Sequence, residues 1–300
     1  MAPRADYQLI DFGGGEKLES FGGRLIRRPS PAAAQAHRRC PSRWNDAASI
    51  FHLKDKRWEH RTEWPDDLVV DCDGFQMGVS PTPFGHVGLF PEQAENWRWL
   101  RDGSAETTDE CPALNSPAVN FSALNLFGYS GASTIALATT GMSVAHVDAA
   151  KANVNACRAA AELNDLTEHP IRFLVDDAAK FAARELRRGN VYHTIVMDPP
   201  AYGHGPSGKA WRLERDLWPL LKDCLQLFNA DDFRLLITGH SPQVGAEEVR
   251  DYLRSMAPAI LGLSKNRLDA CTEYGRLVLR DEAARRLDAG FYVRVESRKL

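Results

Sequence analysis

The sequence predicts an α/β protein in which a Rossmann-like parallel sheet follows a small β-rich N-terminal domain. Beyond residue 122 of this 300-residue chain, short apolar runs alternate with amphipathic helical stretches, as in βαβ units with helices on both faces of a sheet. In the first 80 residues the apolar runs are shorter and separated by Gly, Pro and Asp, which is typical of strands and turns. We therefore expect an accessory domain over residues 1–80 and a large domain over residues 81–300. The strand candidates in the accessory domain are residues 24–26, 50–53, 68–70 and 75–79.

In the large domain, five apolar runs of strand length are separated by helical stretches. Residues 150–161 and 213–228 carry apolar side chains at intervals of three and four, the spacing of one helix face. The tail is expected to add strands over residues 261–270, 275–280 and 291–295, one of them antiparallel. The five strand candidates before the tail are residues 123–127, 144–147, 171–175, 194–197 and 233–238.

The composition indicates a cytoplasmic globular protein. Hydrophobic residues make up 44% and charged residues 26% of the chain, and no run approaches the roughly eighteen apolar residues of a membrane span. The start of the chain leads into no apolar signal-peptide core. The six cysteines form no C-x-x-C pair and no cluster with metal-ligand spacing, so we expect reduced thiols and no metal. The net charge of −3 does not favour a nucleic-acid binder, and the oligomeric state is not indicated.

Residues 20–45 differ in charge from the rest of the chain. Six arginines and no acidic residue lie there, with several prolines and alanines, so we expect a loop or arm. Two roles remain open for it. It is either a solvated surface loop or an arm that contacts phosphates, since the guanidinium fork matches phosphate oxygens.

The segments that follow the strands are candidate sites, because open parallel sheets bind ligands at the carboxyl ends of their strands. The first strand leads into Phe127-Gly128-Tyr129-Ser130-Gly131, where the glycines allow a tight turn and a close ligand. Tyr129 and Ser130 stand where the dinucleotide fingerprint has another glycine. The turn therefore suits a ligand without phosphates better than a dinucleotide.

Carboxylates follow the second and third strands. Asp148 lies twenty residues beyond Gly128, where it is placed to accept both ribose hydroxyls of an adenosine; alternatively, it caps the next helix. Asp176 and Asp177 end the third strand. Asp177 is placed to accept a hydrogen bond from an adenine amine, with the same capping alternative. Together these carboxylates predict a site for an adenosine without phosphate.

The fourth strand ends in the most specific short motif, Asp198-Pro199-Pro200-Ala201-Tyr202. Two successive prolines fix the backbone and end the hydrogen-bond pattern of the sheet, which leaves carbonyl groups free to point toward a ligand. Such a rim can accept hydrogen bonds from an amine or a base edge, and Tyr202 is placed to stack on a ring. The alternative is that the motif is only a stiff turn.

These motifs resemble those of the class I methyltransferases that depend on S-adenosylmethionine (SAM). Among them, the chain is most similar to the large-subunit ribosomal RNA methyltransferases with a small N-terminal domain. The resemblance covers residues 84–242, a little over half of the chain. It rests on GHVGLFPEQ at residues 85–93, NLFGYSG at residues 125–131, Asp148, Asp176-Asp177 and Asp198-Pro199-Pro200.

The resemblance implies SAM as the cofactor and RNA as a partner. It places Phe90, Gln93 and residues 127–131 at the methionine end of SAM, Asp148 at the ribose, Asp177 at the adenine and Asp198 beside the methyl group. We also expect Asp176 to contribute to the cofactor site. The predicted catalytic residues are Asp198, Pro199, Pro200 and Tyr202.

The sequence departs from that family in two places. Members that methylate carbon 5 of cytosine need a cysteine nucleophile. Neither residues 198–204 nor residues 238–242 contain one, and Cys224 lies on the apolar face of a helix. The residue after the prolines is Ala201 instead of an aromatic, which argues against carrying over an exocyclic-amine mechanism from the family. Because no cysteine is placed as a nucleophile, we expect nitrogen or oxygen, and not carbon 5, as the methyl acceptor.

Two further motifs leave alternatives open. Residues 203–210 fit G-x-x-x-x-G-K but lack the final Ser or Thr of a P-loop. We interpret them as a substrate loop in which Lys209 either reaches a phosphate or is solvated. His240 follows the fifth strand and is either a general base or a hydrogen-bonded wall residue.

The sequence as a whole predicts a SAM-dependent methyltransferase that acts on RNA, specifically ribosomal RNA. One alternative is a methyltransferase of a protein or small molecule. The other is a SAM-binding RNA-interaction module without turnover. No catalytic triad or metal is required, because the cofactor carries the reactivity.

Overall fold

The computed structural model describes residues 6–102, 122–205, 210–228 and 232–297. The chain divides into two compact units. Unit 1 comprises Met1–Glu95 and Leu277–Ala289, and unit 2 comprises Asn96–Arg276 and Gly290–Leu300. A domain boundary at residue 80 stays a prediction. Among the described residues, no helix has the length and apolar character needed to cross a bilayer.

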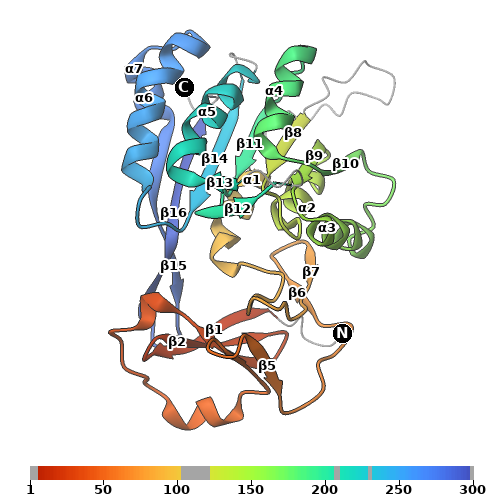
Figure 1. Cartoon of the computed structure of the whole chain (residues 1–300), viewed down its shortest axis with the longest axis vertical. Helices are drawn as coiled ribbons and strands as arrows, with labels where there is room; N and C mark the ends of the chain where they lie inside the picture. The colour runs from red at the N-terminus through yellow and green to blue at the C-terminus, as the bar shows by residue number, and fades with distance from the viewer. Residues whose placement is uncertain (1–5, 103–121, 206–209, 229–231, 298–300) are drawn as a thin grey trace. The chain divides into compact units, whose positions relative to one another are not determined.

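Most of a seven-stranded sheet belongs to unit 2 (Figure 1). In spatial order its strands are β10 (Ile171–Val175), β9 (Ser143–Asp148), β8 (Ser122–Leu126), β11 (Thr194–Met197), β14 (Arg234–Gly239), β16 (Arg286–Glu296) and β15 (Thr272–Arg280). The strands from β10 to β14 pair in parallel, whereas β16 pairs antiparallel with β14. The predicted Rossmann-like sheet with an antiparallel tail strand is confirmed.

Apolar side chains on both faces of this sheet are buried. In β8, Leu124 and Leu126 belong to one core cluster, whereas Ala123 belongs to another that includes Leu100 and Leu137. The alternation follows from the two-residue repeat of a strand. The helices of this part of the chain are α1 (Ala94–Asp102), α2 (Ala132–Ala138), α3 (Lys151–Leu163), α4 (Ala178–Arg188), α5 (Leu213–Gln226), α6 (Ala246–Leu261) and α7 (Lys265–Cys271).

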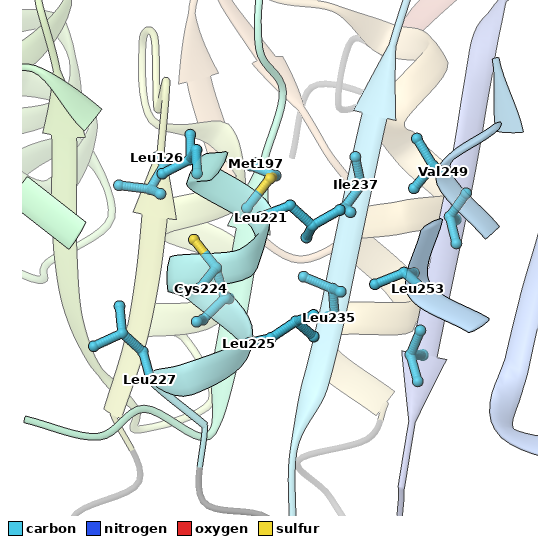
Figure 2. Packing of buried hydrophobic residues seen from close by; sticks show 14 of the residues in the cluster. Leu126, Met197, Leu221, Cys224, Leu225, Leu227, Leu235, Ile237, Val249 and Leu253 are labelled. Carbon is cyan, nitrogen blue, oxygen red and sulfur yellow. The ribbon is translucent and has the colours of Figure 1, made fainter. Parts of the chain in front are cut away.

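Cys224 is a core residue, as its place in the apolar repeat predicts. Figure 2 shows it on α5 among buried side chains that include Leu221, Leu225 and Met197. It is fully buried, and burial raises the pKa of its thiol far above the ordinary value. A thiol in this place has the packing role of a small hydrophobic side chain.

The prediction of a strand over residues 261–270 is wrong. Ser264 caps α7 there by accepting a hydrogen bond from the Arg267 backbone N–H at 3.1 Å. Leu268 and Cys271, three residues apart, are buried, which is the spacing of a helix face and not of a strand. The tail strands expected after this segment are present as β15 and β16.

Unit 1 contains the small β-rich sheet that the sequence predicts. Its strand order is β1 (Tyr7–Gly13), β2 (Glu16–Phe21), β3 (Arg24–Pro29), β4 (Ser49–His52) and β5 (Arg57–His60), and β6 (Val69–Asp71) pairs separately with β7 (Gln76–Gly78). Strands β1 and β2 were not anticipated, because buried carboxylates interrupt their apolar pattern. Asp11 and Glu19 are both fully buried. Asp11 accepts hydrogen bonds from the Trp44 indole at 2.8 Å and from two backbone N–H groups after η1 (Pro31–Ala33).

The expectation of a loop or arm does not hold for all of residues 20–45. The stretch includes β3, η1 and η2 (Pro41–Asp46). Arg27 and Arg38 both pair with Glu16, and Arg28 pairs with Glu19 at 2.7 Å. Arg43 pairs with Glu282 and Arg24 donates to Ser49. Five of the six arginines thus have intramolecular partners, which removes the main structural reason for a phosphate-contacting arm.

Candidate functional site

The predicted site residues of unit 2 lie along one edge of its sheet. Strands β10, β9, β8 and β11 are parallel neighbours, so the segments that follow them leave the sheet at the same edge. Three contacts described below connect these segments: one between Tyr129 and Asp148, one through Trp211, and one between Gly205 and Asp177. The edge therefore brings the motifs together.

Residues 127–131 form a strained turn between β8 and α2. The angle φ is 55° at Phe127, 49° at Tyr129 and 94° at Gly131, all in the left-handed region. Each non-glycine residue held there costs about 1–3 kcal/mol, and such strain gathers at ligand sites. The Tyr129 backbone N–H donates to Asp148 Oδ2 at 2.9 Å. This bond joins the turn to the end of β9.

The two glycines of the turn lie directly against buried side chains. A Cβ on Gly128 would lie 2.5 Å from the ring of His146, and one on Gly131 would lie 2.2 Å from Cys157 Sγ. Both neighbours are fully buried. The glycines are therefore required by the packing beneath the turn, in addition to the tight backbone that the sequence indicates.

Asp148 organises the turn and retains acceptor capacity. Its Oδ1 accepts from the backbone N–H of Ala150 at 2.8 Å and from Asn153 Nδ2 at 3.0 Å, and Oδ2 accepts from Tyr129. The N-cap residue of α3 is Ala150 and not Asp148. A carboxylate offers about four acceptor positions, and three are used here. The half-buried side chain therefore has room for a further donor such as a ribose hydroxyl.

The two carboxylates after β10 have different surroundings. Asp176 forms an ion pair with Arg184, so its charge is already matched. Asp177 is the N-cap residue of α4, and its Oδ1 accepts from the Lys180 backbone N–H at 2.9 Å; the capping alternative is therefore present. A Cβ on Gly205 would lie 2.6 Å from the other oxygen, Oδ2. The segment after β11 thus comes close to this carboxylate.

The turn after β11 presents both a carboxylate and an aromatic ring. Asp198 and Pro200 are exposed and Pro199 is buried. Tyr202, the first residue of β12 (Tyr202–His204), is 57% exposed. The Pro200 carbonyl is not free as predicted, because it accepts a hydrogen bond from Trp211 Nε1 at 2.7 Å.

Trp211 was missed by the sequence reasoning. It lies in β13 (Ala210–Arg212), which pairs antiparallel with β12, and its ring centroid is 4.9 Å from that of Phe127. One side chain thus contacts the turns after β8 and β11. A tryptophan inside a glycine-rich segment, outside any apolar repeat, was the available signal.

The other predicted residues lie elsewhere or are not described. Phe90 and Gln93 belong to unit 1, next to or within η3 (Pro91–Gln93), so their part in a cofactor site stays a prediction. His240 follows β14 and is exposed. Lys209 lies outside the described residues. Within the described residues, no group of three His, Cys, Asp or Glu side chains could hold a metal ion.

Solved structures identify the family. A SAM-dependent methyltransferase from Agrobacterium tumefaciens is 30% identical to the chain, over 98% of this chain and 91% of that one, with a TM-score of 0.83. A proposed SAM-dependent methyltransferase from Streptococcus mutans, 16% identical over 98% and 76% of the two chains, has a TM-score of 0.69. A proposed methyltransferase in complex with S-adenosylhomocysteine (SAH), 15% identical with the same coverage, has a TM-score of 0.70. The last two likenesses show the fold alone. No protein-family model and no curated protein matches the chain.

The chain therefore belongs to the SAM-dependent methyltransferases. It is an enzyme of that class, and its cofactor is SAM. The residues at the sheet edge fit this cofactor: a glycine turn in a strained backbone is followed by a carboxylate with a remaining acceptor position. The turn also lacks the further glycine that a pyrophosphate group requires, which agrees with a cofactor without phosphates.

Proposed function

We propose that the protein methylates a nitrogen or oxygen atom of RNA, with ribosomal RNA as the expected class. The proposal is supported by the exposed ring of Tyr202 beside the Asp198-Pro199-Pro200 turn, since unpaired bases are recognised by stacking on aromatic side chains. The resemblance of the motifs to ribosomal RNA methyltransferases points to the same class of substrate.

In the proposed site, the 127–131 turn holds the methionine end of the cofactor, Asp148 the ribose and Asp177 the adenine. Bound SAM supplies a methyl carbon that its sulfonium makes electrophilic. The Asp198 carboxylate accepts a hydrogen bond from the acceptor group and fixes its direction of approach. The Pro199-Pro200 backbone keeps that carboxylate in place, so alignment is the main contribution of the chain.

A carbon-5 mechanism is not part of the proposal. Covalent attack on a pyrimidine needs an accessible thiolate, whereas Cys224 is fully buried in the core. Neither residues 198–204 nor residues 238–242 contain a cysteine.

A protein or small-molecule acceptor is the second candidate. It is favoured by the intramolecular pairing of Arg27, Arg28 and Arg38, which leaves few unpaired cations in the part of unit 1 expected to bind phosphates. The two candidates differ in the cell fraction that accepts the methyl group.

The test is transfer of radiolabelled methyl groups from SAM into separated RNA, protein and metabolite fractions. We expect label in RNA with the wild-type protein and Cys224→Ala, and about a hundredfold less with Asp198→Ala, equivalent to about 2.7 kcal/mol of barrier. SAH affinity should change much less in Asp198→Ala, because alignment matters at transfer. Label confined to protein or metabolites would overturn the RNA assignment, and an RNA adduct on Cys224 would overturn the mechanism.

A further inference from the structure

Three polar side chains are buried beneath the 127–131 turn. Asn125 in β8, Thr134 in α2 and His146 in β9 are at most 3% exposed. Asn125 Nδ2 donates to Thr134 Oγ1 at 2.9 Å, and Thr134 Oγ1 lies 2.9 Å from His146 Nδ1. Buried polar groups cost free energy unless they are paired, and apolar side chains would fill the same space without that cost. A polar set in this position calls for a functional explanation.

Thr134 Oγ1 connects the other two side chains. It accepts a hydrogen bond from Asn125 Nδ2, and it forms a second hydrogen bond with His146 Nδ1, whose direction depends on which ring nitrogen carries the proton. The hydroxyl links the imidazole to Asn125 in either tautomer. Burial lowers the pKa of His146 to about 4, against a smaller opposite effect of the Tyr129 backbone, so the ring is neutral at physiological pH.

The same ring limits where the turn can lie. A Cβ on Gly128 would come within 2.5 Å of His146 and 3.2 Å of Asn125 Nδ2. The residues on either side, Phe127 and Tyr129, have φ values of 55° and 49°. A backbone in such a conformation relaxes unless its surroundings hold it, and the hydrogen-bonded set lies against its centre.

We propose that Asn125, Thr134 and His146 are positioning residues that hold the 127–131 turn in its cofactor-binding conformation. Thr134 connects the other two and fixes the orientation of the His146 ring. This inference rests on the proposed position of SAM at that turn. It predicts that losing the Thr134 hydroxyl weakens cofactor binding although the hydroxyl does not contact the cofactor.

Two substitutions of Thr134 separate positioning from packing. Thr134→Val keeps the shape and loses the hydroxyl, whereas Thr134→Ser keeps the hydroxyl and loses a methyl group. We expect SAH titration calorimetry to show about tenfold weaker binding for Thr134→Val, the size of one net hydrogen bond. Thr134→Ser should bind SAH more tightly than Thr134→Val, even where thermal unfolding shows it to be the less stable variant because of its cavity.

If Thr134 only fills space, Thr134→Val should bind SAH more tightly than Thr134→Ser. That order of affinities would overturn the inference. Nitrogen NMR of the imidazole is a second measurement: the tautomer population should differ between wild type and Thr134→Val, because the valine side chain offers His146 Nδ1 no hydrogen bond. Asp148→Ala serves as the reference for the cofactor position. If it binds SAH as wild type does, the proposed site is wrong; if it loses binding while Thr134→Val does not, only the positioning role is wrong.

Discussion

The indole Nε1 of Trp211 donates a hydrogen bond to the backbone carbonyl oxygen of Pro200 over 2.7 Å. The same side chain also contacts Phe127, whose ring centroid lies 4.9 Å from that of Trp211. Trp211 therefore connects the turn proposed to align the methyl acceptor with the turn proposed to hold the cofactor. A change at Trp211 is expected to affect methyl transfer without removing any group that reacts.

Trp211→Phe should lower kcat about tenfold and change KM for SAM little. The phenyl ring keeps the contact with Phe127, but the hydrogen bond to Pro200 is lost, and one such bond contributes about a factor of ten. Trp218→Phe on α5 is the matched control, since its neighbour Tyr252 bonds to the Trp218 backbone carbonyl and not to its indole. Initial rates of methyl transfer check the prediction. Equal kcat in the two variants would show that the Trp211 bond has no part in alignment.

Arg28 and Arg39 should differ sharply in their effect on stability. Burial alone would raise the pKa of Glu19, but the charges of Arg28 and Lys17 outweigh it and lower that pKa, so Glu19 is ionised in the core. Arg28→Ala removes the main partner of the Glu19 carboxylate. The substitution should destabilise the protein by about 3–5 kcal/mol, as expected for a broken buried pair.

Arg39 is exposed, and Arg39→Ala should change stability by less than about 0.5 kcal/mol. Urea unfolding measures both variants. Similar midpoints would show that the Arg28–Glu19 pair is not structural.

Arg39→Ala is also the cleaner test of a phosphate contact, and a shallower salt dependence of RNA binding in this variant would restore that role.

Acid should destabilise the protein through His146. Its folded pKa of about 4 lies below the ordinary value of about 6.5, so below about pH 6.5 the unfolded chain binds a proton that the folded chain does not. Stability is therefore fully present above that pH and decreases as the pH falls toward 4, by about 3 kcal/mol in total. Cys157, the titratable group on the other side of the turn, stays a neutral thiol, because burial raises its pKa to about 12.

The imidazole signals of His146 provide the measurement. In the folded protein they should remain those of a neutral ring at about pH 5, which is below the ordinary histidine pKa of about 6.5. A midpoint near 6.5 for His146 would show that the ring is not buried as the structure has it.

The sequence predicts the parallel sheet well because its strands are buried on both faces and read as continuous apolar runs. It fails where polar residues enter the core. Asp11 and Glu19 interrupt the pattern of β1 and β2, and their partners lie on other elements: Trp44 belongs to η2 and Arg28 to β3. The same arginines therefore look like a solvated arm when they are read without those partners.

For the candidate site, the sequence identifies residues that follow strands but not those that act through tertiary contacts. Asp148 and Gly128 were found because strand ends and glycine turns leave local signals. His146 lies inside an apolar strand, where a lone polar side chain could have been noticed, but its link to Thr134 depends on how α2 packs against β9. Trp211 reaches Phe127 only through the β12–β13 hairpin.

Binding of SAH to the wild-type protein and to Asp148→Ala tests the central claim most directly. Calorimetry should show SAH binding to the wild type and about a hundredfold weaker binding to Asp148→Ala, because hydrogen bonds to a charged group contribute about 1.5–3 kcal/mol each. Asp251→Ala, an exposed carboxylate on α6, is the control, and thermal unfolding of all three proteins confirms that they are folded. Equal SAH affinity in wild type and Asp148→Ala would contradict a cofactor site at this edge of the sheet.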